Sequence, residues 1–153
     1  NLDKKFIFSL KIISLFLIFL VIFVSFNKQL IFKSRDYLLV YDTEQEIDKI
    51  KVDRQIFDKI NLDPGGVIVT AKGDNCDFVS RFFTPQASIL EDPVTGSAHC
   101  SLIPFWSSRL KKNQLHAIQI SDRIGKLQCQ NKKDRVTISG KAKTYSIGNL
   151  WIE

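Results

Sequence analysis

The segment EDPVTGSAHC, residues 91–100, places acidic and hydroxyl side chains directly before a long apolar stretch. Asp92 and Pro93 are typical of a type I turn or of the first positions of a helix. Gly96 has no side chain and lets the backbone approach a second group closely. We therefore predict that a helix opens at Ser97 and that its polar end faces a functional site.

The start of this helix can bind an anion. The amide N–H groups of Gly96, Ser97 and Ala98 have no acceptor within the helix, and the helix dipole adds partial positive charge there. Together they suit a carboxylate or an enolate oxygen, and Asp92 beside them can act as an acid or a base. A simpler interpretation is that Asp92, Thr95 or Ser97 only caps the helix.

Apolar residues follow on more than one face of the predicted helix: Cys100, Leu102, Ile103, Phe105, Trp106 and Leu110. A helix that is apolar nearly all round is usually buried. Pro104 removes one backbone hydrogen bond and favours a kink. We expect a buried central helix whose polar N-terminus opens to the outside.

Strand patterns lie on both sides of this helix. Three strands are predicted before the helix, at residues 35–42, 66–73 and 76–85. A polar and partly helical stretch, residues 44–60, lies between the first strand and the second. After the helix, an antiparallel meander is predicted from the strands at residues 116–121, 125–130, 135–140 and 141–152. One helix between two runs of strands favours the α+β class.

Length and charge restrict the kind of protein. The chain has 153 residues, of which 44% are hydrophobic and 25% charged, and this is typical of one globular domain. The net charge of +6 is spread along the chain. Because a nucleic-acid surface usually shows a clustered basic stripe, we do not expect a nucleic acid as a partner.

The cysteines indicate a reducing compartment. Cys76, Cys100 and Cys129 are odd in number and lack the paired spacing of a disulfide framework. No metal site is expected, because the chain has no CxxC motif and no histidine pair at helical spacing. A site built from His99, His116 and the cysteines is a weaker alternative.

An apolar run near the N-terminus, residues 6–26, is interrupted by Lys11. Its length fits a transmembrane helix. The run also lacks helix caps and periodicity. It can therefore equally be sequence that does not belong to the folded domain, as in a fragment or an incomplete gene model. We divide the chain into this apolar segment, residues 1–32, and a folded domain, residues 33–153.

Residues 82–106 and 115–129 resemble the C-terminal half of the phenazine-biosynthesis (PhzF-like) isomerases, which belong to the diaminopimelate-epimerase-like superfamily. The segment EDPVTGSAHC carries most of the likeness, which extends from Arg35 to Glu153. The resemblance implies an α+β lobe, in which a curved, mostly antiparallel sheet wraps around a central helix. It also implies an active site between the N-termini of two such helices.

The resemblance implies roles for individual residues. Asp92 corresponds to the active-site aspartate of the second lobe, and Thr95 helps to shape its turn. Gly96, Ser97 and Ala98 hold the substrate through backbone amides and a hydroxyl. The implied reaction is proton transfer at a carbon atom of a small carboxylic acid, without cofactor or metal. We further expect a cytoplasmic homodimer, or a membrane protein if residues 6–26 form a genuine span.

Two features depart from the family pattern. Family members have two glycines where this chain has Ile124 and Gly125 after Arg123, which puts a substrate contact of Arg123 in doubt. The family's principal acid–base glutamate lies in a first lobe, which nothing in residues 1–32 resembles. We therefore expect one lobe of an isomerase, incomplete by itself. The alternative is a non-catalytic, possibly membrane-tethered, anion-binding module.

Overall fold

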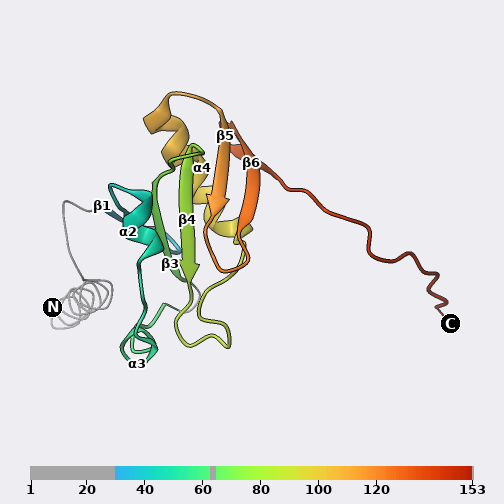
Figure 1. Cartoon of the computed structure of the whole chain (residues 1–153), viewed down its shortest axis with the longest axis horizontal. Helices are drawn as coiled ribbons and strands as arrows, with labels where there is room; N and C mark the ends of the chain where they lie inside the picture. Colours follow the sequence, from blue (N-terminus) through green and yellow to red (C-terminus); the bar gives the residue numbers. More distant parts are fainter. Residues whose placement is uncertain (1–29, 63–64, 153) are drawn as a thin grey trace, which may run out of the picture.

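The computed structural model describes residues 30–62 and 65–152, and its strands form one seven-stranded sheet in sequence order (Figure 1). Within that part of the chain, the strands are β1 (Leu30–Lys33), β2 (Tyr37–Val40), β3 (Val67–Lys72), β4 (Phe78–Phe83), β5 (Gln114–Gln119), β6 (Gly125–Lys132) and β7 (Arg135–Ser139). Four neighbouring pairs are antiparallel and two, β2–β3 and β4–β5, are parallel. The predicted α+β class and mostly antiparallel sheet are confirmed.

Helices make the two parallel crossovers. Parallel neighbours need a long connection from one end of the sheet to the other. The short helices α2 (Glu44–Asp48) and α3 (Arg54–Phe57) lie between β2 and β3, and the longer α4 (Gly96–Leu110) lies between β4 and β5. The sequence analysis predicted α4 and the antiparallel meander β5–β7 but not the parallel pairs.

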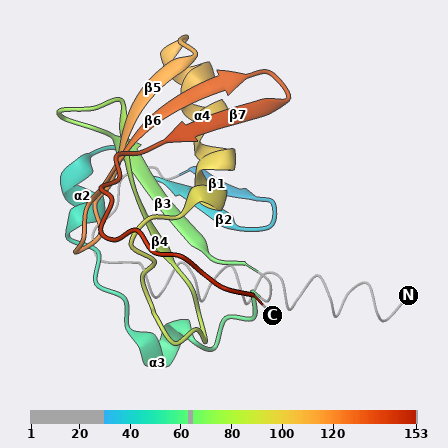
Figure 2. The ribbon, with the colours of Figure 1, turned by 90° about the vertical axis from the view of Figure 1, so that its right-hand side faces the viewer.

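The sheet separates two apolar cores. Successive side chains of a strand point to opposite faces, and in β2 both faces are buried. Leu38 and Val40 join the cluster around α4, whereas Leu39 joins the cluster beneath α2. Figure 2 shows α4 between β1 and β2 on one side and β5, β6 and β7 on the other, so the sheet curves around this helix.

Contacts with the middle of the sheet fix the position of α4. The indole N–H of Trp106 donates to Thr70 Oγ1 at 3.0 Å, and the Thr70 hydroxyl donates to the carbonyl oxygen of Val79 at 2.6 Å. The ring of Phe78 stacks on that of Trp106 with 5.9 Å between centroids. This link ties the C-terminal half of α4 to β3 and β4.

One face of α4 is exposed, contrary to the prediction of a helix buried all round. The sheet covers the face that carries Leu102, Ile103 and Trp106. The opposite face carries small or short side chains exposed to solvent: Gly96, Ser97, Cys100, Ser101, Pro104 and Ser108. The prediction was wrong because Cys100 lies on the exposed face, where serines make up much of the remaining surface. The helix runs through Pro104 without interruption.

The last predicted strand does not form. Residues 141–152 have no regular secondary structure and lead away from the sheet (Figure 1). Their large apolar side chains are exposed: Tyr145, Ile147, Leu150, Trp151 and Ile152. A strand is stable only with a hydrogen-bonded neighbour, and among the described residues none pairs with this segment.

Among the described residues, β1 is the first strand of the sheet. Leu30 pairs with Val40 and Lys33 with Tyr37, so residues 30–32 belong to the sheet. The apolar run 6–26 lies outside the described residues. Within residues 30–62 and 65–152, no helix is both long enough and apolar enough to cross a membrane.

Candidate functional site

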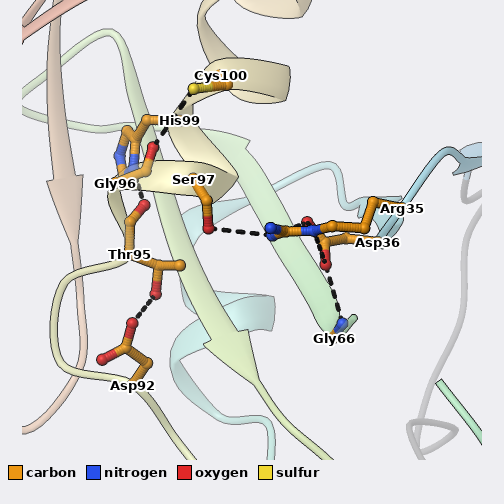
Figure 3. A network of polar contacts seen from close by, with 9 residues as sticks. All are labelled: Arg35, Asp36, Gly66, Asp92, Thr95, Gly96, Ser97, His99 and Cys100. Carbon is orange, nitrogen blue, oxygen red and sulfur yellow. Dashed lines mark hydrogen bonds and ion pairs between the residues drawn. The ribbon is translucent and has the colours of Figure 1, made fainter. Parts of the chain in front are cut away.

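The residue before α4 does not cap the helix with its side chain. Thr95 is the N-cap residue, yet its hydroxyl accepts no hydrogen bond from the first turn. It donates instead to Asp92 Oδ2 at 2.6 Å (Figure 3). Thr95 is buried, whereas Asp92 is partly exposed. The hydroxyl of Thr95 therefore orients the Asp92 carboxylate, and the capping interpretation does not hold for Thr95.

The start of α4 is exposed at Gly96 and Ser97. Neither Asp92 nor any other side chain described accepts a hydrogen bond from the amides of Gly96, Ser97 or Ala98. Gly96 and Ser97 are exposed, and Ala98 is buried against the sheet. A Cβ atom added at Gly96 would meet no atom within 4 Å. An anion can therefore approach the positive end of the helix dipole from this side.

A buried glutamine holds the loop in this shape. Gln119 in β5 is 1% exposed, and its Oε1 accepts from the Thr95 amide at 2.8 Å. Its Nε2 donates to the carbonyl oxygen of Asp92 at 2.6 Å. The Ser121 hydroxyl donates to the carbonyl oxygen of Pro93 at 2.8 Å. The sequence analysis did not select Gln119, although a glutamine at an inward-facing position of a strand was a usable signal.

The acidic neighbour of Asp92 has a structural role. Glu91 forms two hydrogen bonds of 2.7 Å with Arg81, and both side chains are largely buried. Arg81 also donates to the carbonyl oxygens of Ile47 at 3.0 Å and Ile50 at 2.9 Å. This pair fastens the loop to the segment that follows α2. Both oxygens of the Glu91 carboxylate are therefore bound to Arg81, away from α4.

An arginine that the sequence analysis did not select contacts the first turn of α4. Arg35, which precedes β2, donates from Nη2 to Ser97 Oγ at 3.0 Å (Figure 3). The same nitrogen lies 2.7 Å from Asp36 Oδ2. Asp36 is 6% exposed and also accepts from the Gly66 amide at 2.9 Å. The hydrogen bond to Asp36 raises the pKa of Arg35, so the guanidinium stays charged.

The two histidines do not form a metal site. His99 is fully buried in α4, its Nδ1 lies 2.8 Å from the carbonyl oxygen of Thr95, and burial lowers its pKa. His116 lies on the face of β5 opposite to Leu115, which packs in the core around α4. Among the described residues, no group of three or more histidines, cysteines or acids could hold a metal ion.

The site is thus the N-terminus of a central helix in an α+β lobe, with Asp92 and Arg35 beside it. A family model described as "Phenazine biosynthesis-like protein" matches residues 26–148, and the chain belongs to this family. An uncharacterized isomerase of Pseudomonas aeruginosa is 46% identical over 121 residues, which cover 78% of this chain and 46% of the relative. The human phenazine biosynthesis-like domain-containing protein is 44% identical over 92 residues, which cover 56% of this chain and 32% of that protein.

Solved structures support the same assignment. A PhzF-family protein of Enterococcus faecalis superposes with a TM-score of 0.71 at 45% identity, covering 80% of this chain and 46% of that one. A putative PhzC/PhzF protein of Clostridium difficile has a TM-score of 0.70 at 44% identity, covering 80% and 47%. The resemblance inferred from EDPVTGSAHC is confirmed. The chain spans between about a third and a half of the length of these relatives.

Proposed function

We propose that this chain supplies one half of the active site of a phenazine biosynthesis-like isomerase. The reaction is the removal and return of a proton at a carbon atom of a small carboxylic acid, without a cofactor. The observation that carries this proposal is the start of α4, where Asp92 is oriented by Thr95 and no side chain of residues 30–62 or 65–152 caps the first amides. Relatives with 46% and 42% identity are named isomerases, which supports the reaction class.

Substrate binding and proton transfer are assigned to different residues. The amides of Gly96, Ser97 and Ala98, with the Ser97 hydroxyl, bind the carboxylate of the substrate. When the C–H bond breaks, negative charge moves onto the carboxylate oxygens, and hydrogen-bond donors with the helix dipole stabilise it. Asp92 takes or returns the proton. Thr95 and Gln119 hold Asp92 in place for this transfer.

No described glutamate lies at the start of α4 to act as the family's acid–base glutamate. Besides Glu91, which Arg81 occupies, two glutamates are described, and both lie in α2. Glu46 closes the capping box with Thr43, and Glu44 accepts from the amide of Asp74 at 2.8 Å. Neither faces the start of α4. A second lobe that carries the family's glutamate is therefore required for isomerisation.

The alternative function is a non-catalytic anion-binding module, which the same free amides favour. It would keep carboxylate binding and never exchange a proton at carbon. We place the isomerase in the cytoplasm, because the described cysteines Cys76, Cys100 and Cys129 are all free thiols. A homodimer with a small carboxylic acid as substrate, and no nucleic acid, completes the proposal.

The anion site can be tested by NMR on the chain labelled with 15N-glycine, which carries seven glycines. Sodium acetate is the probe, and acetamide is the neutral control of similar shape. Loss of one signal in Gly96→Ala assigns Gly96. We expect acetate to move the Gly96 signal saturably and acetamide to leave it in place. Equal shifts with both probes, or none with acetate, would contradict the anion site.

A further inference from the structure

We propose that Arg35 is a positioning residue that turns the Ser97 hydroxyl toward the bound carboxylate. This inference rests on the proposed function of the site and adds a residue to it. Arg35 lies 62 positions from Ser97 in the chain, and its Nη2 donates to Ser97 Oγ at 3.0 Å. It links the turn between β1 and β2 to the first turn of α4.

The guanidinium of Arg35 is held firmly. Its Nε lies 3.2 Å from both carboxylate oxygens of Asp36, and its Nη2 lies 2.7 Å from Oδ2. Asp36 is itself anchored, since it is buried and accepts from the amide of Gly66 at 2.9 Å. The side chain of Arg35 is half exposed. The buried carboxylate of Asp36 therefore holds the guanidinium of Arg35 in position to donate to Ser97.

The direction of this hydrogen bond decides what Ser97 can do. A guanidinium only donates, so the oxygen of Ser97 accepts, and the single hydroxyl proton of Ser97 has to point elsewhere. No acceptor among the described residues takes that proton. Ser97 directly follows Gly96 in the first turn of α4, where the proposed function places the anion. A charged donor behind the oxygen also polarises the hydroxyl and strengthens it as a donor.

The arrangement also orients the substrate. Figure 3 shows Asp92 below the first turn of α4, next to Thr95, and Arg35 to the right of that turn, facing Ser97. A carboxylate on the Ser97 side places the rest of the ligand toward Asp92. The favoured substrate class is therefore a carboxylic acid whose reacting C–H bond is directed away from Arg35.

A double-mutant cycle tests this role in the full chain, with the Gly96 amide signal as readout and acetate as probe. Arg35→Met should weaken acetate binding about tenfold, as expected for loss of a charge-assisted hydrogen bond. Ser97→Ala should weaken it by a similar factor. The double variant should bind no more weakly than Ser97→Ala, because Arg35 acts through the hydroxyl. Arg35→Lys should retain part of the affinity, since lysine keeps the charge without the fork.

The signals of Gly73 and Gly125, which pack against Cys76 and Val94, show whether each variant remains folded. Arg35→Met with wild-type affinity would overturn the proposal. The proposal would also be overturned if Arg35→Met weakened acetate binding by the same factor in the wild-type chain and in Ser97→Ala. Arg35 would then act independently of the hydroxyl. If acetate fails to move Gly96 in the wild-type chain, the anion site of the proposed function is wrong, and the role of Arg35 falls with it.

Discussion

The hydroxyl of Thr95 donates to the carboxylate of Asp92 at 2.6 Å, although Thr95 occupies the N-cap position of α4. A threonine at this position usually accepts a hydrogen bond from the first turn and so satisfies a free amide. Here the amide of Thr95 is itself bound to the buried Gln119, at 2.8 Å from its Oε1. The loop therefore orients an acid and leaves the helix end available for a ligand.

Gly96 should matter for binding and not for folding. A Cβ atom there meets no atom within 4 Å, and valine has a higher helix propensity than glycine. We expect Gly96→Val to leave the free energy of unfolding within about 0.5 kcal/mol of the wild-type value. It should abolish acetate binding in calorimetry, because the branched side chain blocks the amides.

The matched control for this variant is Gly148→Val. Gly148 also has open space around it but lies in the C-terminal segment, away from α4. Gly148→Val should bind acetate like the wild type. Normal affinity in folded Gly96→Val would return the start of α4 to a structural role.

Ile124 should be a site of backbone strain. Its φ angle is +49°, a left-handed conformation that costs a β-branched residue about 1–2 kcal/mol. The resemblance to the family implies a glycine at this position. We expect Ile124→Gly to raise the free energy of unfolding by about 1 kcal/mol in urea titration.

Ile89→Gly provides the comparison, since Ile89 is exposed to a similar extent and is not among the residues with positive φ. That variant should gain no stability. A loss of stability in Ile124→Gly would show that the strain is smaller than the added flexibility of glycine in the unfolded chain.

Gln119 should be essential for the shape of the loop. Gln119→Leu leaves the Thr95 amide and the Asp92 carbonyl oxygen without their partners in a buried setting. Each such group costs about 1–3 kcal/mol, so we expect a loss of roughly 2 kcal/mol or more in urea unfolding. Gln128→Leu, at an exposed position of β6, should change stability little. Equal effects of the two variants would argue against a specific role for Gln119.

His99 should make stability depend on pH. Burial lowers its pKa in the folded chain below the ordinary value of about 6.5. The unfolded chain then binds one more proton as the pH falls below about 6.5, so the free energy of unfolding falls with it, by up to about 1.4 kcal/mol per pH unit. Above that pH the free energy of unfolding keeps its full value, because the unfolded chain no longer takes up this proton.

The measurement for His99 is urea unfolding between about pH 5 and pH 7, on either side of the ordinary histidine pKa. Asp58 and Asp77, whose pKa values are lowered, contribute only at more acidic pH. His99→Phe should flatten the dependence, because the replacement cannot take up a proton, whereas His116→Gln should retain it. A slope that survives in His99→Phe would assign the proton uptake to another group.

The sequence was sufficient for local features of the fold. The strands around residues 35–42, 66–73 and 116–121 and the helix after Thr95 follow from residue patterns that repeat within a few positions. The parallel pair β2–β3 was missed, because strand order depends on contacts between distant segments. The strand at residues 141–152 was wrong because its pattern contains no information about a pairing partner.

The same distinction applies to the site. Asp92, Thr95, Gly96 and Ser97 lie in one segment, and the structure brings them together at the start of α4. Their roles in binding and proton transfer remain predictions. Arg35 reaches Ser97 only through the curvature of the sheet, so no local pattern could identify it.

The most direct test of the half-site account is proton exchange at carbon. The chain in D2O is incubated with a mixture of proteinogenic amino acids, lactate and malate, and 1H NMR follows their α-proton signals. A second sample adds the N-terminal half of the 46% identical Pseudomonas aeruginosa relative. We predict no exchange by the chain alone, exchange of at least one acid in the combined sample, and a loss of about 100-fold or more in Asp92→Asn. Robust exchange by the chain alone would contradict the account.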